Sequence, residues 1–546
     1  MSLPKQAIEP VPEDTAQVAR KAFPKGNPYV QMRDLLGTIY TDDVFADLYP
    51  PDGQPAIRPW RLALVTVMQF AENLTDRQAA DAVRDRIAWK YGLSLSLIDA
   101  GFDYSVLCEF RQRLLDHDAA QQLLDVMLSR FAEQGWLKIR GKQRTDSTHI
   151  LAAIRQLNQL ELVHETLRHA LNELAVEAPA WLRQRVNTDW FDSYSQRTSN
   201  YLLSKKEAER KAWAEQVGQD GLYLLEQVYA GGHHPELAQL PAVDMLRRVW
   251  IQHFYQHEER VCLREKRDQP PAARLITSPY DPEARCSTKR NVTWIGYKVH
   301  LTETCDDDTP NLITNVETRP ATEPDHDATE VIHDHLVANG YTPGEHFVDQ
   351  GYMSIDHVVQ QAEAGVDLMG AVPDDNSWQA REGGYDSRQF VIDWDNEQAV
   401  CPQGHESCSW SLAQTRSQRP VVKIKFRHRD CAACPALHLC TNNHEKRRTL
   451  TILAPQALYE AQQAARQRQQ TADFKEACHI RAGVEGTIAQ AAHVLDTRRS
   501  RYRGMDKTHL QHSGIAAAIN LLRVINWLND VPRSKTPQSR FARLAA

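Results

Sequence analysis

The chain has 546 residues, a formal net charge of −7 and an ordinary globular composition, with 42% hydrophobic and 25% charged residues. This length predicts several domains, and this composition excludes wholesale disorder. The acidic balance does not indicate a nucleic-acid binder, although a local basic patch can bind nucleic acid in an acidic protein. Ten cysteines and the lack of a charged-then-apolar leader over residues 1–24 indicate a reducing cytosol. No run of 18 apolar residues occurs, so we expect no membrane span and interpret Gly514–Leu528 as a core helix.

The N-terminal part is predicted to be a set of short helices. Apolar residues follow a helical period from Trp60, and Thr75 with Gln78 fits a capping box that starts the next helix. A further helix is expected from Ser105. Short helices joined by tight turns, with arginines directed outward, suit a helix-turn-helix-like DNA module. A plain helical bundle with solvated arginines is the alternative.

Strand signals occupy the middle of the chain and are interrupted by a second helical block. The leucines of this block indicate ordinary helix packing, with self-association as the minority interpretation. Without the block, the elements run β-β-β-α-β-α-β. We expect strands at 143–149, 293–302, 312–318, 345–349 and 366–370, and helices at 325–336 and 354–365. Three opening strands followed by alternation predict a mixed sheet with helices on both faces.

A helix is predicted to follow Ile480, with Glu485 one turn beyond Arg481 on the flank of its apolar face. Gly483 and Gly486 each cost about 1 kcal/mol relative to Ala inside a helix. Two such residues indicate that something approaches this helix closely. A dense basic cluster follows, which needs an anionic partner or open water. It comprises Arg498, Arg499, Arg501, Arg503 and Lys507.

Three carboxylates are placed to converge. Asp146 lies on the first strand, Asp349 at the end of the fourth and Glu485 on the last helix. The first and fourth strands can be neighbours at the centre of the sheet, with the helix packed across them. Carboxylates suit Mg²⁺ or Mn²⁺, and two such ions about 4 Å apart can support an in-line phosphoryl displacement.

These residues also carry a family resemblance. The stretches are Arg-Thr-Asp146-Ser-Thr-His, Phe-Val-Asp349-Gln-Gly-Tyr and Arg481-Ala-Gly-Val-Glu485-Gly-Thr. They resemble the three acidic motifs of bacterial insertion-sequence DDE transposases. The segment from Arg498 to His512 is similar to the end of the same domain, and the segment from Thr75 to Arg84 resembles the N-terminal domain of one subgroup.

The resemblance implies an α/β fold with a ribonuclease-H-like core, in a bacterial cytoplasmic enzyme. It implies metal-dependent strand cleavage and transfer at the ends of the insertion sequence, with Asp146, Asp349 and Glu485 binding two Mg²⁺ or Mn²⁺ ions. It also implies that Arg481 contacts a DNA phosphate. The partners would be double-stranded DNA, as terminal inverted repeats and target, and a second copy of the chain in the DNA complex. Cys478 and Ala492 depart from the Tyr and the basic residue that related elements carry.

Other basic residues could contact DNA. Lys298 follows Gly-Tyr on the second strand, where its ammonium could reach a phosphate beside Asp146 or remain solvated. Arg498, Arg499, Arg501 and Arg503 are expected to neutralise phosphates and make binding salt-dependent.

A cysteine cluster before the last helix predicts a zinc site. Cys431 and Cys434 form a C-x₂-C pair, with Cys440 downstream and Cys401 upstream. Four thiolates would make a closed, structural Zn²⁺ site. Cys401 is preferred because the Pro-Gln-Gly that follows it suits a knuckle-like turn. Rival fourth ligands are Cys408, His405, His428 and His444, and unpaired structural cysteines are the alternative.

The predicted organisation follows from these elements. The segments are an N-terminal extension (1–57), a helical DNA-binding domain (58–137), the first catalytic strand (138–151), a helical insertion (152–275), a ribonuclease-H-like catalytic core (276–375), a cysteine-rich zinc insertion (376–455), C-terminal helices of the core (456–530) and a flexible tail (531–546). Two other functions remain open. One is a site-specific DNA-binding protein with an inactive nuclease core, and the other is a metal-dependent nuclease that does not transpose.

Overall fold

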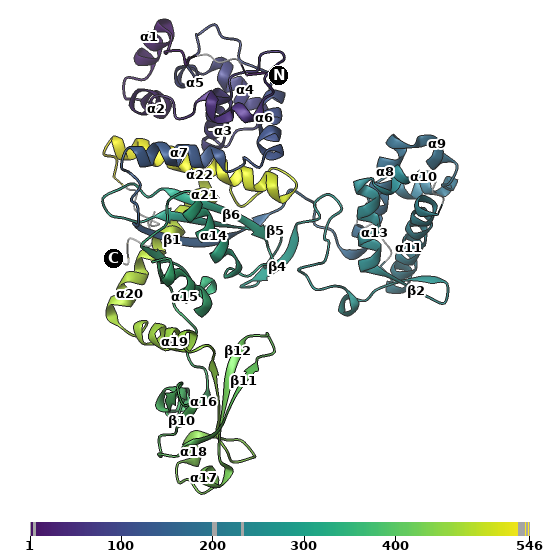
Figure 1. Ribbon diagram of the computed structural model, residues 1–546. Coiled ribbons are helices and arrows are strands. Elements are labelled where there is room, and N and C mark those ends of the chain that lie inside the picture. Colours follow the sequence, from purple (N-terminus) through teal and green to yellow (C-terminus); the bar gives the residue numbers. More distant parts are fainter. Residues whose placement is uncertain are drawn as a thin grey trace.

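A six-stranded mixed sheet forms the centre of the computed structural model (Figure 1). The structure describes residues 2–3, 7–198, 205–230, 234–532, 541 and 544. The strands of the sheet are β1 (Lys142–Leu151), β4 (Arg285–Lys289), β5 (Val292–Thr304), β6 (Ile313–Pro320), β7 (Glu345–Phe347) and β8 (Asp367–Met369). Their order is β4–β5–β1–β7–β8, and β6 also pairs with β5. Because β1 is antiparallel to β5 and parallel to β7, the sheet is mixed, as the sequence predicts.

The predicted order of strands and helices is confirmed, with one addition. Helices α14 (Asp327–Ala338) and α15 (Ile355–Glu363) separate β6, β7 and β8. Strand β4 was not expected, because its sequence Arg-Cys-Ser-Thr-Lys has no apolar alternation. It pairs with β5 as one arm of a hairpin at the edge of the sheet and buries none of its residues fully. An edge strand needs no continuous apolar run, so its sequence gives a weak signal.

Helices cover the sheet on both sides. Strand β5 buries Val299 and Leu301 as well as the alternate residues His300 and Thr302, which point to the opposite face. Figure 1 shows α7 and α22 (Met505–Leu528) on one side of the sheet, and α14 and α15 on the other. The sheet is therefore the middle layer of the central unit, as expected for strands buried on both faces.

The N-terminal helices join this central unit. They are α1 (Glu13–Ala22), α2 (Pro28–Leu36), the 3₁₀ helix η1 (Asp42–Leu48), α3 (Pro59–Ala71), α4 (Asp76–Asp85), α5 (Ile87–Gly92), α6 (Ser105–Asp116) and α7 (Gln122–Glu133). The expected capping box is present, since Thr75 Oγ1 accepts from the Gln78 N–H and Gln78 Oε1 accepts from the Thr75 N–H. Apolar residues of α1 and α2 belong to the same core as α3 and the sheet, so no break in packing occurs at residue 57.

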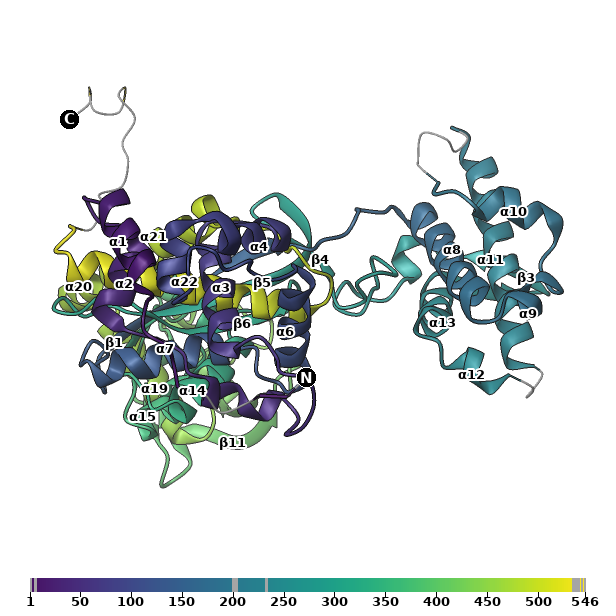
Figure 2. The ribbon, with the colours of Figure 1, turned by 90° about the horizontal axis from the view of Figure 1, so that it is seen from above.

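The segment between β1 and β4 is a helical body with its own core. It contains α8 (Gln159–Glu177), α9 (Pro179–Arg183), α10 (Thr188–Tyr194), α11 (Glu207–Tyr229), α12 (Pro235–Ala238), α13 (Pro241–His253), the strands β2 (Phe254–His257) and β3 (Arg260–Leu263), and the 3₁₀ helix η3 (Lys266–Asp268). Its buried apolar residues form a cluster separate from that of the sheet. Figure 2 shows this body standing to one side of the central unit.

The cysteine-rich segment is a third body with a third core. It contains α16 (Trp378–Glu382), the 3₁₀ helix η5 (Ser387–Gln389), β9 (Val391–Asp393), β10 (Gln398–Val400), β11 (Ser407–Gln414), β12 (Pro420–Phe426), α17 (His428–Ala432), α18 (Leu437–Cys440) and β13 (Thr449–Leu453). Strands β11, β12 and β13 form an antiparallel sheet, and β9 pairs with β10. It projects from the end of the molecule opposite the N-terminal helices (Figure 1).

The chain then returns to the central unit through α19 (Gln456–Arg468), α20 (Ala472–His479), the 3₁₀ helix η6 (Ile480–Ala482), α21 (Gly483–Val494) and α22. Helix α22 is buried along most of its length between α3 and β6, which confirms the expected core helix. Within the described residues, no helix has the length and apolar character that crossing a bilayer requires. Most of the predicted flexible tail (531–546) lies outside the described residues.

Candidate active site

The three predicted carboxylates, Asp146, Asp349 and Glu485, line one cleft of about 490 Å³. Asp146 lies within β1, and Asp349 lies two residues after β7, which pairs in parallel with β1. The Asp349 carboxylate caps the 3₁₀ helix η4 (Gln350–Tyr352) by accepting from the Gln350 N–H at 2.9 Å. Neighbouring strands thus bring together two side chains that are far apart in the sequence.

Glu485 enters the same cleft from the first turn of α21. That helix buries Val484, Thr487 and Ile488 against the sheet and so turns the glutamate outward. The Glu485 side chain is 66% exposed. Helix α21 packs against both β1 and β5, as the sequence predicts for a helix lying across the sheet centre.

Arg481 lies between two of the carboxylates. Its guanidinium is 3.1 Å from Asp146 Oδ2 and 3.6 Å from Glu485 Oε1. Burial raises the pKa of the Asp146 carboxyl, and the charge of Asp349 raises it further. The Ser147 N–H and the Arg481 guanidinium act on that pKa in the opposite direction. The first two acids therefore interact electrostatically, and one arginine offsets part of their repulsion.

The donor chemistry of the cleft fits a hard divalent cation. Carboxylate oxygens from three elements face one space, and Mg²⁺ and Mn²⁺ prefer such oxygens. Among the described residues, no three His, Cys, Asp or Glu side chains lie close enough together to hold a metal ion. In this arrangement the cation nearest to Asp146 and Glu485 is the Arg481 guanidinium.

Two segments of the chain match family models. Residues 400–525 match the family described as Transposase DDE domain, and residues 17–113 match the one described as Transposase domain (DUF772). These two matches support an insertion-sequence DDE transposase. The DDE-domain match includes Glu485 but does not extend to Asp146 or Asp349. Comparisons with curated proteins and with solved structures gave no match.

The basic residues of the transposase that were predicted to bind DNA occupy different surroundings. Arg481 and Arg498 line the cleft, and Arg498 Nε donates to Thr148 Oγ1 at 3.2 Å. Lys298 also lines the cleft, but its ammonium donates to Asp325 Oδ1 at 2.9 Å and to the Glu323 carbonyl. Lys298 is therefore held in an ion pair on the wall of the cleft.

The remaining arginines of the basic cluster lie elsewhere. The Arg501 guanidinium donates to the Leu74 carbonyl at 2.6 Å and to Asn73 Oδ1, and it lies over the Phe70 ring. Arg503 is stacked over Tyr280, 4.9 Å from the ring centroid. Arg499 lines a separate pocket beside the end of β1. Four arginines adjacent in sequence thus divide between the cleft and other parts of the transposase.

The cleft also contains residues to which the sequence analysis gave no chemical role. They are Ser147, Thr148, His149, Lys289, Arg290, Val292, Trp294, Ile488, Ala489 and His493. The β4–β5 hairpin supplies Lys289, the last residue of β4, and Arg290 of the turn. The rings of His149 and Trp294 lie 5.5 Å apart. Arg290-Asn291 between the two strands was the available signal for this turn, because Asn readily adopts the left-handed conformation found at Asn291.

The four predicted zinc ligands surround one small cavity of about 20 Å³ in the third body. Cys401, Cys431, Cys434 and Cys440 all line it, together with His405, whereas the exposed Cys408 does not. The Gly404 N–H donates to the Cys401 carbonyl at 2.8 Å, so a tight turn follows Cys401 as expected. Burial, reinforced by the neighbouring thiols, raises the pKa of Cys431 and raises that of Cys440 to about 11. Nearby thiols of this kind suit a thiophilic cation that would hold them deprotonated.

Proposed function

We propose that the transposase cleaves DNA strands at the ends of its insertion sequence and joins them to target DNA. The observation that carries this proposal is the convergence of Asp146, Asp349 and Glu485 on one cleft in a chain with two transposase domains. These three residues would hold two Mg²⁺ or Mn²⁺ ions. Such ions, when bound, activate an attacking oxygen and stabilise a leaving oxygen in an in-line displacement.

The residues around the carboxylates have distinct roles in this proposal. Arg481 neutralises Asp146 and Glu485 in the absence of DNA and is placed to pair with a DNA phosphate when one enters. Arg498 on the cleft wall would hold a second phosphate. The substrates are double-stranded terminal repeats and target DNA, and two copies of the chain would act together in the DNA complex, in a bacterial cytoplasm.

We also propose a ribonuclease-H-like assignment for the central sheet. Its support is the strand order β6–β5–β1–β7–β8. Strand β5 is antiparallel to both β6 and β1, β7 is parallel to β1, and β8 is parallel to β7. With this order, Asp146 on β1 and Asp349, two residues after β7, follow neighbouring strands. In the third body, Cys401, Cys431, Cys434 and Cys440 would hold a structural Zn²⁺, because they surround one cavity and leave no position open to substrate.

The test is Mg²⁺-dependent nicking of a labelled duplex carrying the end of the element. Glu485→Gln keeps the size of the side chain but removes its charge, so nicking should fall by several orders of magnitude. Binding in a gel-shift assay and the melting temperature should persist, because arginine and lysine contacts to phosphates supply most of the affinity. Asp146→Asn and Asp349→Asn should behave alike, and double variants should be far from additive.

Glu476→Gln is the matched control, since Glu476 is an exposed glutamate on α20 that does not line the cleft. It should nick as the wild type does. Near-normal nicking by Glu485→Gln would mean that another residue of the chain is the third metal ligand. A wild-type protein that binds the ends without nicking them would be a DNA-binding protein with an inactive core. Nicking without joining of the free 3′-OH would indicate a nuclease that does not transpose.

A further inference from the structure

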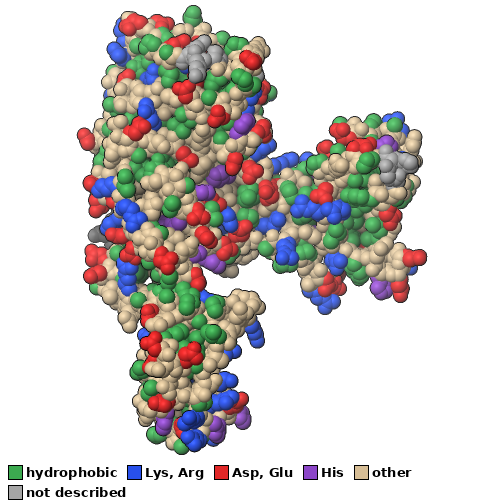
Figure 3. All heavy atoms as spheres, in the orientation of Figure 1, with side chains coloured by type: hydrophobic (Ala, Val, Ile, Leu, Met, Phe, Trp, Pro, Cys, Tyr) green, Lys and Arg blue, Asp and Glu red, His purple; other side chains and the backbone are tan. Residues whose placement is uncertain are grey.

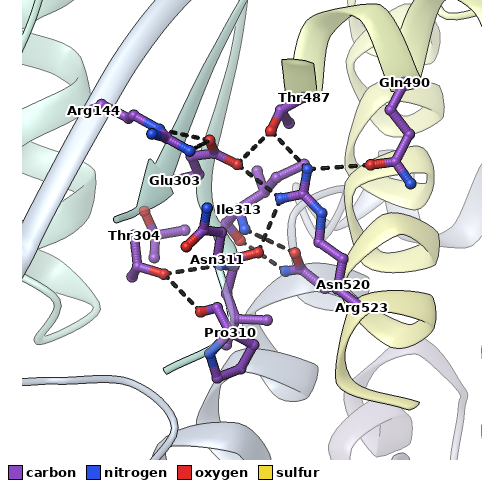
Figure 4. Close-up of polar contacts among 12 residues, drawn as sticks. Arg144, Glu303, Thr304, Pro310, Asn311, Ile313, Thr487, Gln490, Asn520 and Arg523 are labelled. Atoms are coloured by element: carbon purple, nitrogen blue, oxygen red, sulfur yellow. Dashed lines mark hydrogen bonds and ion pairs between the residues drawn. The ribbon is translucent and has the colours of Figure 1, made fainter. Parts of the chain in front are cut away.

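A buried polar network connects the strand that carries Asp146 to the helix that carries Glu485 (Figure 4). Its members are Arg144, Glu303, Thr487 and Arg523. We propose that this network positions α21, so that Glu485 faces Asp146 across the cleft. The inference rests on the proposed function, because it assigns Glu303, Thr487 and the two arginines as positioning residues for the metal-binding carboxylates.

Glu303 is the centre of the network. It lies on β5 directly opposite Arg144 of β1, and its side chain is 0% exposed. Arg144 donates from Nε at 2.7 Å and approaches with Nη2 at 2.6 Å, both to Glu303 Oε1. The other oxygen, Oε2, accepts from the Thr487 hydroxyl at 2.5 Å and from Arg523 Nη1 at 2.7 Å. Both carboxylate oxygens are thus engaged inside the protein, and Glu303 does not line the cleft.

Arg144 holds the beginning of the catalytic helix directly. Its Nη1 donates to the Ile480 carbonyl at 2.8 Å, in the turn that leads into α21. The guanidinium also fills the space that a side chain at position 483 would occupy, since a Cβ there would lie 1.9 Å from Nη1. This is the close approach that the sequence predicts for Gly483. At Gly486, apart from its chain neighbours and the backbone of its own helix, no atom of the described residues lies within 4 Å of the point that a Cβ would occupy. No such close approach within the described residues therefore accounts for the second glycine.

Arg523 of α22 holds the same helix from its other side. Its Nη2 donates to Thr487 Oγ1 at 2.6 Å and to Gln490 Oε1 at 3.1 Å, while Nη1 also reaches the Asn311 carbonyl at 2.9 Å. The Thr487 hydroxyl therefore donates to Glu303 and accepts from Arg523. Glu485 lies two residues before Thr487, on the opposite, exposed side of the helix.

The chemistry of the network favours one arrangement of α21. A buried carboxylate is costly unless every oxygen has a donor, and a buried arginine is costly unless it has an acceptor. Sliding or rotating α21 would remove the Thr487 hydroxyl from Glu303 and Arg523 together. The network thus resists small displacements of the helix more strongly than apolar packing does, and it acts at the turn from which Glu485 projects.

Thr487→Val tests the inference, because it keeps the shape of the side chain and removes the hydroxyl. Binding of Mn²⁺ to the full-length protein is followed by electron paramagnetic resonance, and the specific site is defined as the Mn²⁺ that Glu485→Gln fails to bind. The half-saturating Mn²⁺ concentration should rise roughly 10-fold or more, as when a group supporting a metal ligand is removed. Thr487→Ser should restore most of the affinity, since it returns the hydroxyl.

Two controls separate positioning from general loss of stability. Thr166→Val removes a buried threonine hydroxyl in α8 of the helical insertion and should leave Mn²⁺ binding unchanged. Gly483→Ala should displace the Arg144 guanidinium and weaken Mn²⁺ binding. Gly486→Ala, in the same helix and with open space at its Cβ position, should bind Mn²⁺ as the wild type does.

The possible outcomes are distinct. Equal Mn²⁺ affinity of Thr487→Val, Thr487→Ser and the wild type would overturn the positioning role while leaving the proposed function intact. Weakened binding in Thr166→Val to the same extent would also overturn it. A wild-type protein that neither binds Mn²⁺ at Glu485 nor nicks DNA would remove the proposed function itself, and the inference with it.

Discussion

At the scale of single residues, Arg481 determines the charge balance of the cleft. It is within 3.6 Å of Glu485 and within 3.1 Å of Asp146, whose pKa is raised by burial. Without a cation, two carboxylates facing each other across a half-buried space would repel each other. The guanidinium lowers that repulsion without closing the cleft. A phosphate that attracts Arg481 would therefore leave the carboxylates free for divalent ions.

The arginines after α21 are not equivalent, and this difference predicts how DNA binding depends on salt. Arg498→Ala should reduce the slope of log Kd against log salt concentration by about one unit, because Arg498 lines the cleft and would neutralise one phosphate. Arg501→Ala should leave the slope unchanged. It should instead lower the free energy of unfolding by roughly 1–3 kcal/mol, since Arg501 donates to Leu74 and Asn73 of the N-terminal helices.

Salt titrations of binding, together with denaturant unfolding of both variants, provide the measurement. Equal slopes for Arg498→Ala and the wild type would place Arg498 away from DNA. A reduced slope for Arg501→Ala would mean that the guanidinium leaves its present partners when DNA binds. From sequence alone these arginines are four similar charges, because their partners come from distant parts of the chain: Leu74 and Asn73 for Arg501, Thr148 for Arg498 and Tyr280 for Arg503.

At the scale of elements, the cysteine-rich body provides the next prediction. Cys434→Ser should lower the stability of this body by kilocalories rather than tenths of a kilocalorie per mole, because binding of a structural zinc contributes directly to folding. Zinc content should fall from about one equivalent per chain to near zero. Cys408→Ser is the matched control, since Cys408 is exposed on β11 and does not line the cavity.

Elemental analysis of protein purified without chelator, and thermal melts of both variants, test this prediction. Less than about half an equivalent of zinc in the wild type would count strongly against the site. Loss of zinc in Cys408→Ser but not in a Cys401 variant would identify Cys408, in place of Cys401, as the fourth zinc ligand.

The far end of this body, around α17 and α18, carries exposed Arg427, His428 and Arg429, and Figure 3 shows basic and histidine side chains gathered there.

Elements with strong periodicity were predictable from the sequence, and buried charges were not. The apolar strands and the order β-β-β-α-β-α-β followed from alternation, which reports burial directly. Glu303 and Arg144 were missed because a charged residue in a sequence usually indicates a solvated position. Their pairing across β1 and β5 depends on strand register, which the sequence does not specify locally. The clearest available hint was Gly483, whose helical cost required a compensating neighbour.

At the scale of the whole molecule, buried histidines predict how stability depends on pH. Burial lowers the pKa of His300 and His512 to about 3 and that of His333 and His509 to about 4, and it lowers that of His346 strongly. In the unfolded chain these groups titrate near 6.5. Between these values the unfolded state binds more protons, so stability should fall as pH is lowered from about 7 toward 4.

The measurement is the free energy of unfolding of the metal-free protein at pH 7.5 and at several lower pH values. These values lie on both sides of the ordinary pKa of histidine. Asp125 opposes the trend, because burial raises its pKa to about 6, and burial also raises the pKa values of Asp146 and Glu317. The buried histidines with a lowered pKa, which also include His253, outnumber these three carboxyls. His512→Gln should make the unfolding free energy depend less steeply on pH, because the unfolded state would then bind one fewer proton in excess of the folded state. An unfolding free energy that stays constant over this range would contradict the neutral, buried state of these histidines.

The position of β1 in the chain has a consequence for biosynthesis. Its partners β5 and β7 are made only after the whole helical insertion, and α21 and α22 come later still. Because the insertion has its own core, it can fold before β1 pairs with the strands that follow the insertion. The length of the insertion adds little to the entropic cost of bringing these strands together. A ribosome adding roughly 5–20 residues per second needs tens of seconds to pass from Asp146 to Arg523. Nascent chains therefore carry the N-terminal helices well before the cleft lined by Asp146, Asp349 and Glu485 can form.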